Sequence, residues 1–210
     1  MSEVTEKSWA HFDLTSFEQV HKGILDVLPK PPAKILDVGA GTGRDSRALS
    51  ELGYQVTAVE PTPQLFKEAS SRSSPLVEWI SDRLPELRHL GDRQFDFVLV
   101  SAVWMYLAPQ TRQAAMHRLS SLLRPQGALA ITTRPPQQTD NPADLWDATT
   151  EEVEQAANSA GLEQLRLRTD ADSLGRDISW TTYVFKRLDG ARPRRPHFVS
   201  HPTGLSRAGD

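Results

Sequence analysis

A glycine-rich turn preceded by an acidic residue is the segment whose residue types are best suited to bind a ligand. It reads Leu36-Asp37-Val38-Gly39-Ala40-Gly41-Thr42-Gly43, and residues 34–38 have the apolar character of a buried strand. Glycines at positions 39 and 41 let the backbone turn tightly and approach a ligand closely, because no Cβ intervenes. Ligands of open α/β sheets bind beyond the carboxyl ends of the strands, so this turn is the first candidate site.

The spacing of these glycines distinguishes the turn from two common phosphate-binding motifs. A dinucleotide-binding fingerprint would need its third glycine at position 44, where Arg44 stands instead. A P-loop would need Gly-Lys-Ser/Thr after the glycines, and the sequence continues differently. Asp37 would also repel a pyrophosphate, whereas it can attract a cationic ligand.

A second acidic residue, Glu60, follows the next expected strand (residues 55–59) and lies 21 residues after Gly39. A carboxylate at this place can accept hydrogen bonds from both hydroxyls of a ribose. Together with Asp37, it favours a nucleoside that carries a positive charge and no phosphate. S-adenosylmethionine matches that description.

The chain resembles the class I S-adenosylmethionine-dependent methyltransferases from about Ile35 to Arg187. The resemblance rests on the glycine motif, on Glu60 after the second strand and on a terminal pair of antiparallel strands. It implies methyl transfer from S-adenosylmethionine, with Asp37 near the amino group of the cofactor and Glu60 on its ribose. The cofactor-binding residues that it implies are Asp37, Gly39, Ala40, Gly41, Gly43, Glu60, Pro61, Asp82, Arg83, Leu84, Ser101 and Ala102.

Two parts of this set rest on their position after a strand. Asp82, with Arg83 and Leu84, follows the third expected strand, where the family contacts the adenine. Asp82 could equally be a solvated loop residue without a function. Ser101, Ala102 and Val103 follow the fourth strand, where the family places the methionine portion and the acceptor.

The residues after the fourth strand exclude several kinds of methyltransferase. The segment Ser101-Ala102-Val103-Trp104-Met105-Tyr106 holds no Pro-Pro pair, which the family uses to methylate the exocyclic amine of a nucleobase or the amide of glutamine. Methylation of cytosine at C5 needs a cysteine nucleophile, and the chain contains no cysteine. Ser101 stands in the region where small metal-dependent enzymes of the family place a carboxylate, so no metal is expected. What remains is transfer by placement, in which the acceptor is aligned near the activated methyl group and water is excluded.

Aromatic side chains are the candidates for the acceptor side. Trp104 and Tyr106 could line the acceptor pocket, and Tyr106 could also move a proton. Both could instead pack the following helix against the sheet. Residues that precede the first helix or follow the fifth strand are further substrate-binding candidates, and Arg134 suits a substrate carboxylate. These additional candidates are Trp9, His11, Phe12 and Arg134.

The elements that must position these residues alternate between strands and helices. The pattern predicts an α/β fold with a single doubly wound, Rossmann-like sheet of seven strands and helices on both faces. Five βα repeats are followed by a C-terminal antiparallel hairpin. Strands are expected at residues 34–38, 55–59, 76–80, 95–100, 127–133, 162–168 and 181–187. Helices are expected at residues 14–28, from Arg44 to the glycine at 53, after Pro63, at 109–123 and from Thr149 to Gly161.

Three segments are expected along the chain. Residues 1–33 form an N-terminal helical cap, with a capping box of Thr15 and Glu18 at the start of its helix. Residues 34–188 form the methyltransferase domain. Residues 189–210 are rich in arginine and proline and are expected to be a disordered tail, although a basic arm or a linker would have the same composition.

Composition limits the remaining possibilities. A chain of 210 residues suits one α/β domain. The net charge of −3 argues against a nucleic-acid partner, and the absence of cysteine excludes disulfides and thiolate-bound metals. No apolar run reaches the roughly 18 residues that span a bilayer. A cytoplasmic protein without a membrane partner is expected, as a monomer or homodimer.

The predicted function is methyl transfer to a nitrogen or oxygen of a small-molecule acceptor, without a metal. One alternative keeps the reaction but takes RNA or protein as substrate, with the Arg-rich tail as the docking arm. A second alternative is a non-catalytic protein that binds S-adenosylmethionine, since binding and transfer are separate requirements. A nicotinamide-dependent oxidoreductase is disfavoured by Arg44.

Overall fold

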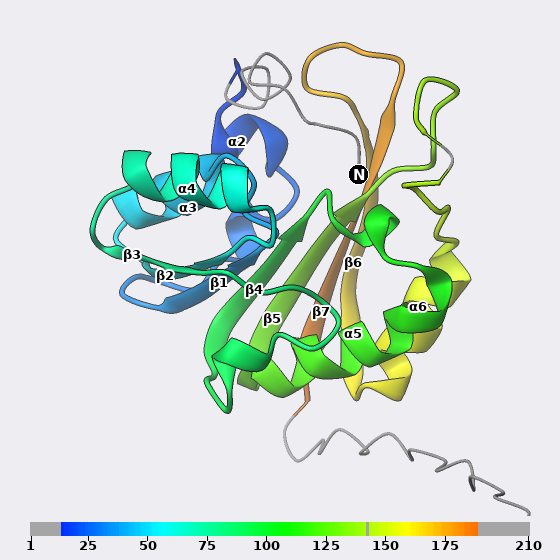
Figure 1. Ribbon diagram of the computed structural model, residues 1–210. Helices are drawn as coiled ribbons and strands as arrows, with labels where there is room; N and C mark the ends of the chain where they lie inside the picture. The colour runs from blue at the N-terminus through cyan, green and yellow to red at the C-terminus, as the bar shows by residue number, and fades with distance from the viewer. Residues whose placement is uncertain (1–13, 142, 189–210) are drawn as a thin grey trace, which may run out of the picture.

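The computed structural model describes residues 14–141 and 143–188 of the chain. These residues form three layers, in which a seven-stranded sheet lies between two groups of helices (Figure 1). The expected substrate residues Trp9, His11 and Phe12 and the expected tail, residues 189–210, lie outside the described residues.

The sheet has the doubly wound order that the sequence predicts. Strands β1 to β5 are parallel, and β7 runs antiparallel to both of its neighbours, β5 and β6. The order across the sheet is β3-β2-β1-β4-β5-β7-β6, so the direction of winding reverses between β1 and β4. Ligands of such sheets bind at this reversal. The strands are β1 Lys34–Val38, β2 Gln55–Val59, β3 Val77–Ile80, β4 Phe95–Ser101, β5 Leu123–Thr133, β6 Leu162–Ala171 and β7 Ser179–Arg187.

Helices cover both faces of the sheet. Helices α2, α3 and α4 lie on one side, and α5 and α6 lie on the other (Figure 1). The bounds are α2 Phe17–Val20, α3 Arg44–Glu51, α4 Pro63–Arg72, α5 Pro109–Leu122 and α6 Thr150–Ser159. Short 3-10 turns add η2 Leu25–Val27, η3 Arg88–Leu90 and η4 Trp104–Tyr106.

The expectation of five βα repeats was wrong at one position. Strands β1, β2, β4 and β5 are each followed by an α-helix, but residues 81–94 after β3 contain only η3. Arg118 of α5 organises this segment instead, because its guanidinium donates to the carbonyl oxygens of Glu86, Leu87 and Gly91 at 2.8–2.9 Å. A side chain from the next helix thus satisfies backbone groups that a helix would have paired internally.

Alternation along β1 divides the core between the two faces of the sheet. Leu36 and Val38 belong to the apolar cluster under α5 and α6, whereas Ile35 belongs to the cluster that includes Leu49 of α3. Successive side chains of a strand point to opposite faces. Asp37 therefore shares the face of Ile35 and points toward α3, next to the glycine turn.

The N-terminal segment departs from the single helix expected at residues 14–28. The structure has the four-residue α2 and the separate turn η2, and the capping box is formed by Ser16 and Gln19, one residue later than expected. The chain leaves the helix at His21, whose ring nitrogen Nε2 lies 2.8 Å from Asp45 Oδ2. Lys22 and Gly23 follow in a turn, and glycine is a weak helix former. A tertiary contact thus overrides the apolar periodicity.

Other helix limits follow their sequence signals closely. The box of Thr149 and Glu152 starts α6 as expected, and Gly161 follows its end with a φ of +73°. Gly53 follows α3 in the same way, with a φ of +90°. Strand β5 begins at Leu123 and not at Gly127, because the chain passes from α5 directly into an irregular part of the ladder with β4.

Candidate functional site

The glycine turn follows β1 at the point where the sheet reverses its order. Gly39, Gly41 and Gly43 have φ values of +73°, +57° and +79°. Residues with a Cβ rarely adopt this region. A Cβ on Gly39 would lie 2.3 Å from Cγ2 of Val103, which follows β4. The loops after β1 and β4 therefore pack against each other, and only glycine fits between them.

Gly41 is required for a different reason from Gly39. The nearest atom to a Cβ at Gly41 would be the carbonyl oxygen of Gly39, at 4.0 Å. The protein therefore leaves open space beside Gly41, whereas a Cβ at Gly43 would lie 3.0 Å from the ring of Trp79. An open space at a glycine between two packed ones is suited to the close approach of a ligand.

Glu60 lies beside this space at the carboxyl end of β2. Its side chain is buried, and Oε2 accepts a hydrogen bond of 2.9 Å from the backbone N–H of Gly41. Oε1 accepts a hydrogen bond of 2.8 Å from the N–H of Thr62. These bonds orient the carboxylate, and each oxygen keeps a lone pair for a further donor. The arrangement suits a ligand that offers two hydroxyls.

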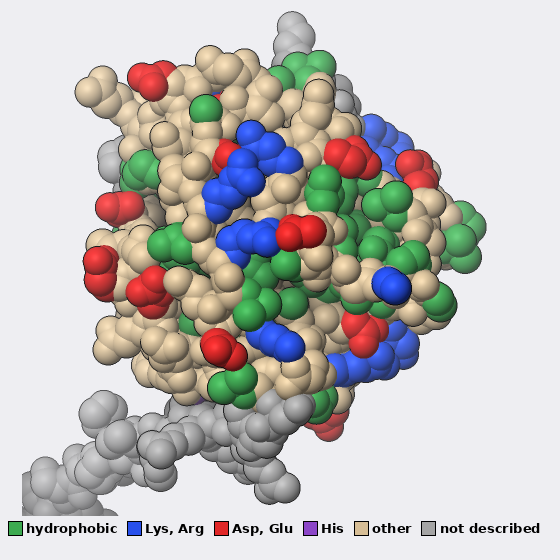
Figure 2. All heavy atoms as spheres, turned by 180° about the vertical axis from the view of Figure 1, so that it is seen from behind, with side chains coloured by type: hydrophobic (Ala, Val, Ile, Leu, Met, Phe, Trp, Pro, Cys, Tyr) green, Lys and Arg blue, Asp and Glu red, His purple; other side chains and the backbone are tan. Residues whose placement is uncertain are grey.

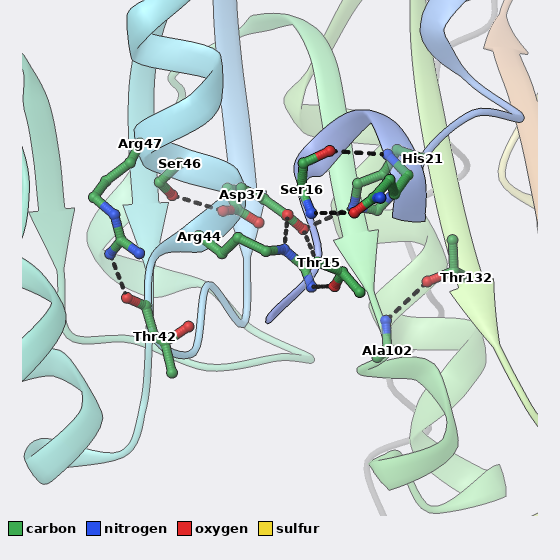
Figure 3. Close-up of polar contacts among 12 residues, drawn as sticks. Thr15, Ser16, His21, Asp37, Thr42, Arg44, Ser46, Arg47, Ala102 and Thr132 are labelled. Carbon is green, nitrogen blue, oxygen red and sulfur yellow. Dashed lines mark hydrogen bonds and ion pairs between the residues drawn. The ribbon is translucent and has the colours of Figure 1, made fainter. Parts of the chain in front are cut away.

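Asp37 and Asp45 form a buried pair of carboxyl groups behind the turn. Ser46 of α3 donates a hydrogen bond of 2.6 Å from Oγ to Asp37 Oδ2 (Figure 3). Burial, and secondly the charge of Asp45, raise the pKa of Asp37 to about 7. Burial would also raise the pKa of Asp45, but His21 and Arg44 outweigh it and hold that pKa below its usual range. Asp37 is thus the group whose charge can respond to a bound cation near neutral pH.

The segment after β3 places its three expected cofactor residues differently. Asp82 accepts hydrogen bonds from the N–H groups of Arg83 and His89 at 2.8 and 2.7 Å. These bonds give Asp82 a structural role in the loop, and its contact with an adenine stays a prediction. Arg83 is exposed, and Leu84 is buried in the core under α5.

The backbone after β4 has an unusual conformation. Ser101 ends the strand, and Ala102 has a φ of +55° although it is not a glycine. The N–H of Ala102 is held by the carbonyl oxygen and the hydroxyl of Thr132, at 3.1 and 3.0 Å (Figure 3). Such backbone strain persists where the surroundings fix it and is frequent at ligand sites. It directs Val103 against the glycine turn.

The two aromatic residues expected on the acceptor side have different surroundings. Trp104 is 0% exposed and packs in the core cluster under α5 and α6, so it does not line an open pocket. Tyr106 is exposed at the carboxyl edge of the sheet. Desolvation of its phenol raises the pKa of Tyr106, which the nearby charge of Arg134 partly offsets. Of the two, only Tyr106 is accessible from outside, and its contact with an acceptor stays a prediction.

Arg134, the expected partner of a substrate carboxylate, already has a carboxylate partner. It forms a two-pronged ion pair with Asp140, at 2.6 and 2.9 Å. Its guanidinium also lies 6.0 Å from the ring centre of Trp180. The side chains of Arg134 and Asp140 are 12% and 16% exposed. Arg134 therefore fixes the loop after β5, a role that its position in the sequence does not reveal.

Several residues that shape the site were missed by sequence reasoning. His21 reaches Asp45 through a contact 24 residues apart, for which the sequence carries no local signal. Val103 is expected near the methionine portion, but its packing against Gly39 was not foreseen. Ser46 was identified only as part of a helix face, although its hydroxyl binds Asp37. Within residues 14–141 and 143–188, no three His, Asp or Glu side chains gather as a metal site would require. In the same residues, no helix is long and apolar enough to cross a bilayer.

Comparison with known proteins identifies the same region of the chain. Residues 35–127 match the family model of a methyltransferase domain. An uncharacterised methyltransferase of Mycobacterium tuberculosis is 31% identical over 107 residues, which are 50% of this chain and 41% of that protein. A ubiquinone biosynthesis O-methyltransferase of Xanthomonas campestris is 34% identical over 104 residues, 49% of this chain and 44% of the relative. The chain thus spans less than half of the length of these two relatives.

A solved structure extends the likeness to most of the fold. The 1,6-didemethyltoxoflavin-N1-methyltransferase of Burkholderia thailandensis, solved with 1,6-didemethyltoxoflavin and S-adenosylhomocysteine, superposes with a TM-score of 0.63 at 21% identity. The superposition covers 82% of this chain and 85% of that one. At this identity the likeness establishes the fold alone. Residues 35–127 thus match a methyltransferase domain, and the chain has the fold of solved S-adenosylmethionine-dependent methyltransferases, with a sheet order and a glycine turn that agree with the match.

Proposed function

We propose that this protein binds S-adenosylmethionine at the carboxyl edge of the sheet and transfers its methyl group to a nitrogen or oxygen of a small molecule. The observation that carries the proposal is the open space beside Gly41, bounded by the packed glycine turn and by the oriented carboxylate of Glu60. The open space and the two free lone pairs match a nucleoside that is held close to the backbone.

The roles of the binding residues follow from their positions. The turn from Gly39 to Gly43 holds the methionine portion, with Asp37 as the countercharge for its amino group. Glu60, followed by Pro61, binds the ribose hydroxyls. The loop from Asp82 to Leu84 borders the adenine, and Ser101 and Ala102 border the reacting end. Residues 34–188 are the catalytic domain, and residues 14–33 form a cap beside it.

When bound, the cofactor supplies a methyl group on a sulfonium, which is a good leaving group. With the cofactor held by the glycine turn and Glu60, a lone pair of the acceptor would bond to this methyl carbon as the carbon–sulfur bond breaks, and the electron pair of the broken bond would stay on sulfur. The acceptor then loses a proton to solvent. The residues of the chain align the two reactants and exclude water, and both effects accelerate such a transfer.

The acceptor is one whose lone pair is available at neutral pH. Tyr106 is the phenol at this edge, and its raised pKa keeps it protonated, so it serves as a hydrogen-bond donor and not as a base. The Xanthomonas relative is named as an O-methyltransferase of ubiquinone biosynthesis, and the Burkholderia structure is that of an N1-methyltransferase of 1,6-didemethyltoxoflavin. Both names support a small acceptor that is methylated at oxygen or nitrogen. An amine, a ring nitrogen or a phenolate fits this description.

The charge distribution supports a small acceptor over a nucleic acid. On the face drawn in Figure 2, basic side chains lie next to acidic ones and form no continuous basic surface. Binding to a phosphate backbone requires several adjacent cations. The absence of cysteine fits a reducing compartment, so we propose a cytoplasmic protein. We also propose that it acts as a monomer or homodimer.

The experiment that tests the function is an assay for S-adenosylhomocysteine formation with methyl-labelled cofactor. The acceptors are a small-molecule extract and, separately, the RNA and protein fractions of the same cells. The proposal predicts label transfer to the small-molecule fraction, lost in Glu60→Ala and kept in Glu68→Ala, a matched change of an exposed carboxylate on α4. Transfer only to RNA or protein would contradict the proposed acceptor class. Binding without transfer to any fraction would contradict catalysis.

A further inference from the structure

A histidine and a carboxylate are buried together beside the glycine turn, although neither is expected to touch the cofactor. The side chain of His21 is 0% exposed and that of Asp45 is 7% exposed. His21 Nε2 lies 2.8 Å from Asp45 Oδ2. The pair joins the residue after α2 to the first turn of α3, across 24 positions of the sequence.

Arg44 adds a second connection between the same two segments. Its guanidinium donates to both oxygens of Asp45, at 2.7 and 3.1 Å, and to the hydroxyl of Thr15 at 3.4 Å (Figure 3). The ring of Phe17 is buried 4.8 Å from the ring of His21. Residues 15–21 therefore rest on the first turn of α3 through polar contacts, and the ring of Phe17 packs on His21 within the segment.

The place of this contact links it to the proposed cofactor site. Helix α3 begins at Arg44, directly after Gly43 of the glycine turn. Asp45 is also close enough to Asp37 for their charges to interact. The contact of His21 with Asp45 thus holds residues 15–21 next to the glycine turn, at the edge of the space in which the cofactor would lie.

The same N-terminal segment has a second anchor that lies far from the turn. Arg166 of β6 forms a two-pronged ion pair with Asp26, at 2.6 and 2.7 Å, and donates to the carbonyl oxygen of Gly23. This anchor fixes the segment to the last strand of the sheet. Weakening this anchor is a control for the loss of the His21 contact, because the anchor holds the N-terminal segment at Gly23 and Asp26, away from the glycine turn.

Burial makes the His21–Asp45 pair poorly suited to be a simple source of stability. Buried polar and charged pairs can often be replaced by apolar residues without loss of stability, because desolvation offsets the attraction. In some proteins such pairs instead fix a segment in one defined position. We propose that the His21–Asp45 pair is a latch that holds residues 15–21 at the edge of the cofactor site, so that His21 is a positioning residue for cofactor retention.

This inference rests on the proposed function, since the retained ligand is the cofactor. It predicts a kinetic effect and not a change in the binding contacts themselves. Opening of the latch exposes one edge of the site, so the cofactor leaves faster while its arrival changes little. The latch is also independent of the acceptor, so it can be measured before the acceptor is known.

The test measures association and dissociation rates of S-adenosylhomocysteine for the full chain and three variants. In His21→Ala the dissociation rate is expected to rise by a factor of about ten or more, with an association rate within about threefold of the original. His21→Gln keeps a donor near Asp45 and is expected to restore most of the slow dissociation. Asp26→Asn weakens the remote anchor and is expected to leave both rates unchanged.

Hydrogen exchange provides a readout that needs no ligand. The amides of Val20 and His21, bonded to the carbonyl oxygens of Ser16 and Phe17, are expected to exchange faster in His21→Ala than in Asp26→Asn. A folded His21→Ala variant with the original dissociation rate, or equal effects of His21→Ala and Asp26→Asn, would overturn the latch. An unaltered protein that binds no S-adenosylhomocysteine would overturn the proposed function itself.

Discussion

At the residue scale, Gly39 and Gly41 illustrate how neighbouring glycines can serve different ends. Both have a positive φ, but Gly39 faces Val103 whereas Gly41 faces open space. Gly39 is needed because the side chain of Val103 leaves no room for a Cβ. Gly41 is explained by the space beside it, which a ligand could occupy.

This difference leads to a prediction that separates folding from binding. Gly39→Ala is expected to destabilise the fold by about 2 to 4 kcal/mol, from the left-handed backbone and the clash together. Gly41→Ala is expected to cost only about 1 to 2 kcal/mol, from the backbone alone. Its Cβ would nevertheless enter the ligand space, so the affinity for S-adenosylhomocysteine should fall at least tenfold. Urea unfolding and calorimetric titration measure the two quantities.

The double variant Gly39→Ala, Val103→Ala is the control for the clash. It should recover part of the stability that Gly39→Ala loses, because the Cγ2 atom at 2.3 Å is removed. A Gly41→Ala protein that binds as tightly as the original would mean that no ligand lies beside Gly41.

Asp37 provides a pH-dependent prediction at the same scale. Its pKa is raised to about 7, so the carboxyl group is partly protonated in the ligand-free protein at neutral pH. A cationic amino group binds the ionised form of Asp37, so the affinity for S-adenosylhomocysteine should increase from about pH 6 to about pH 8. Below the pKa of Asp37, the increase should be at most roughly tenfold for each pH unit. Calorimetry over this range should find that Asp37→Asn binds more weakly and without this slope. A flat profile in the unaltered protein would contradict the assigned role.

The sign of the stability effect is opposite for Asp37 and Asp45. Asp37 binds its proton more tightly folded than unfolded, so its contribution to the free energy of unfolding decreases as the pH rises from about 4 to about 7. Asp45 has a lowered pKa, so its contribution is present above about pH 4 and is lost as the pH falls further.

The sequence identified the turn and its acidic partner because both follow directly from spacing along one strand–turn–helix unit. It could not assign the partners of Trp104, Asp82 and Arg134, since these depend on segments that meet only in the folded chain. Arg134 stands at the ligand edge as expected, yet Asp140 occupies its guanidinium. Position after a strand therefore predicts the neighbourhood of a side chain but not its availability.

At the element scale, the segment between β3 and β4 depends on a side chain from another element. Arg118 of α5 donates to three carbonyl oxygens of residues 86–91. No helix periodicity in residues 81–94 predicts this arrangement. It explains how the loop that carries Asp82 keeps a fixed shape with only one 3-10 turn.

Arg118→Met should therefore destabilise the protein by about 2 to 4 kcal/mol, because three carbonyl groups lose charge-assisted donors while the apolar stem is kept. Arg72→Met, which affects an exposed pair with Glu68 on α4, should cost at most about 0.5 kcal/mol. Chemical denaturation of both variants measures the difference. Equal effects would mean that Arg118 does not organise the loop.

Helix prediction succeeded where a local signal decided the outcome and failed where a distant contact did. The capping box of Thr149 and Glu152 and the glycine at 161 specify both ends of α6. The apolar spacing of residues 14–28 predicted one long helix, but the contact of His21 with Asp45 and the anchor of Asp26 on Arg166 divide it. The structure joins segments 24 and 140 residues apart in these two contacts, which no local pattern encodes.

At the scale of the whole molecule, the alternation of strands and helices was sufficient to predict the doubly wound sheet and its terminal hairpin. Parallel strands require crossovers, and right-handed crossovers leave few possible orders. The observed order β3-β2-β1-β4-β5-β7-β6 brings the ends of β1, β2 and β4 together. The candidate site lies where these three strands end, which explains why its residues come from distant parts of the sequence.

The central claim is that the space beside Gly41 and Glu60 binds S-adenosylmethionine. Thermal unfolding with S-adenosylmethionine, S-adenosylhomocysteine or NAD, compared between the original chain and Glu60→Ala, tests it most directly. At 100 times the dissociation constant, either adenosyl ligand should stabilise the original chain by about 2.7 kcal/mol, a shift of about 5 to 10 °C. NAD should give no shift, and Glu60→Ala should lose the response to both adenosyl ligands. Equal stabilisation of Glu60→Ala, a response to NAD alone, or no response to any ligand would contradict the claim.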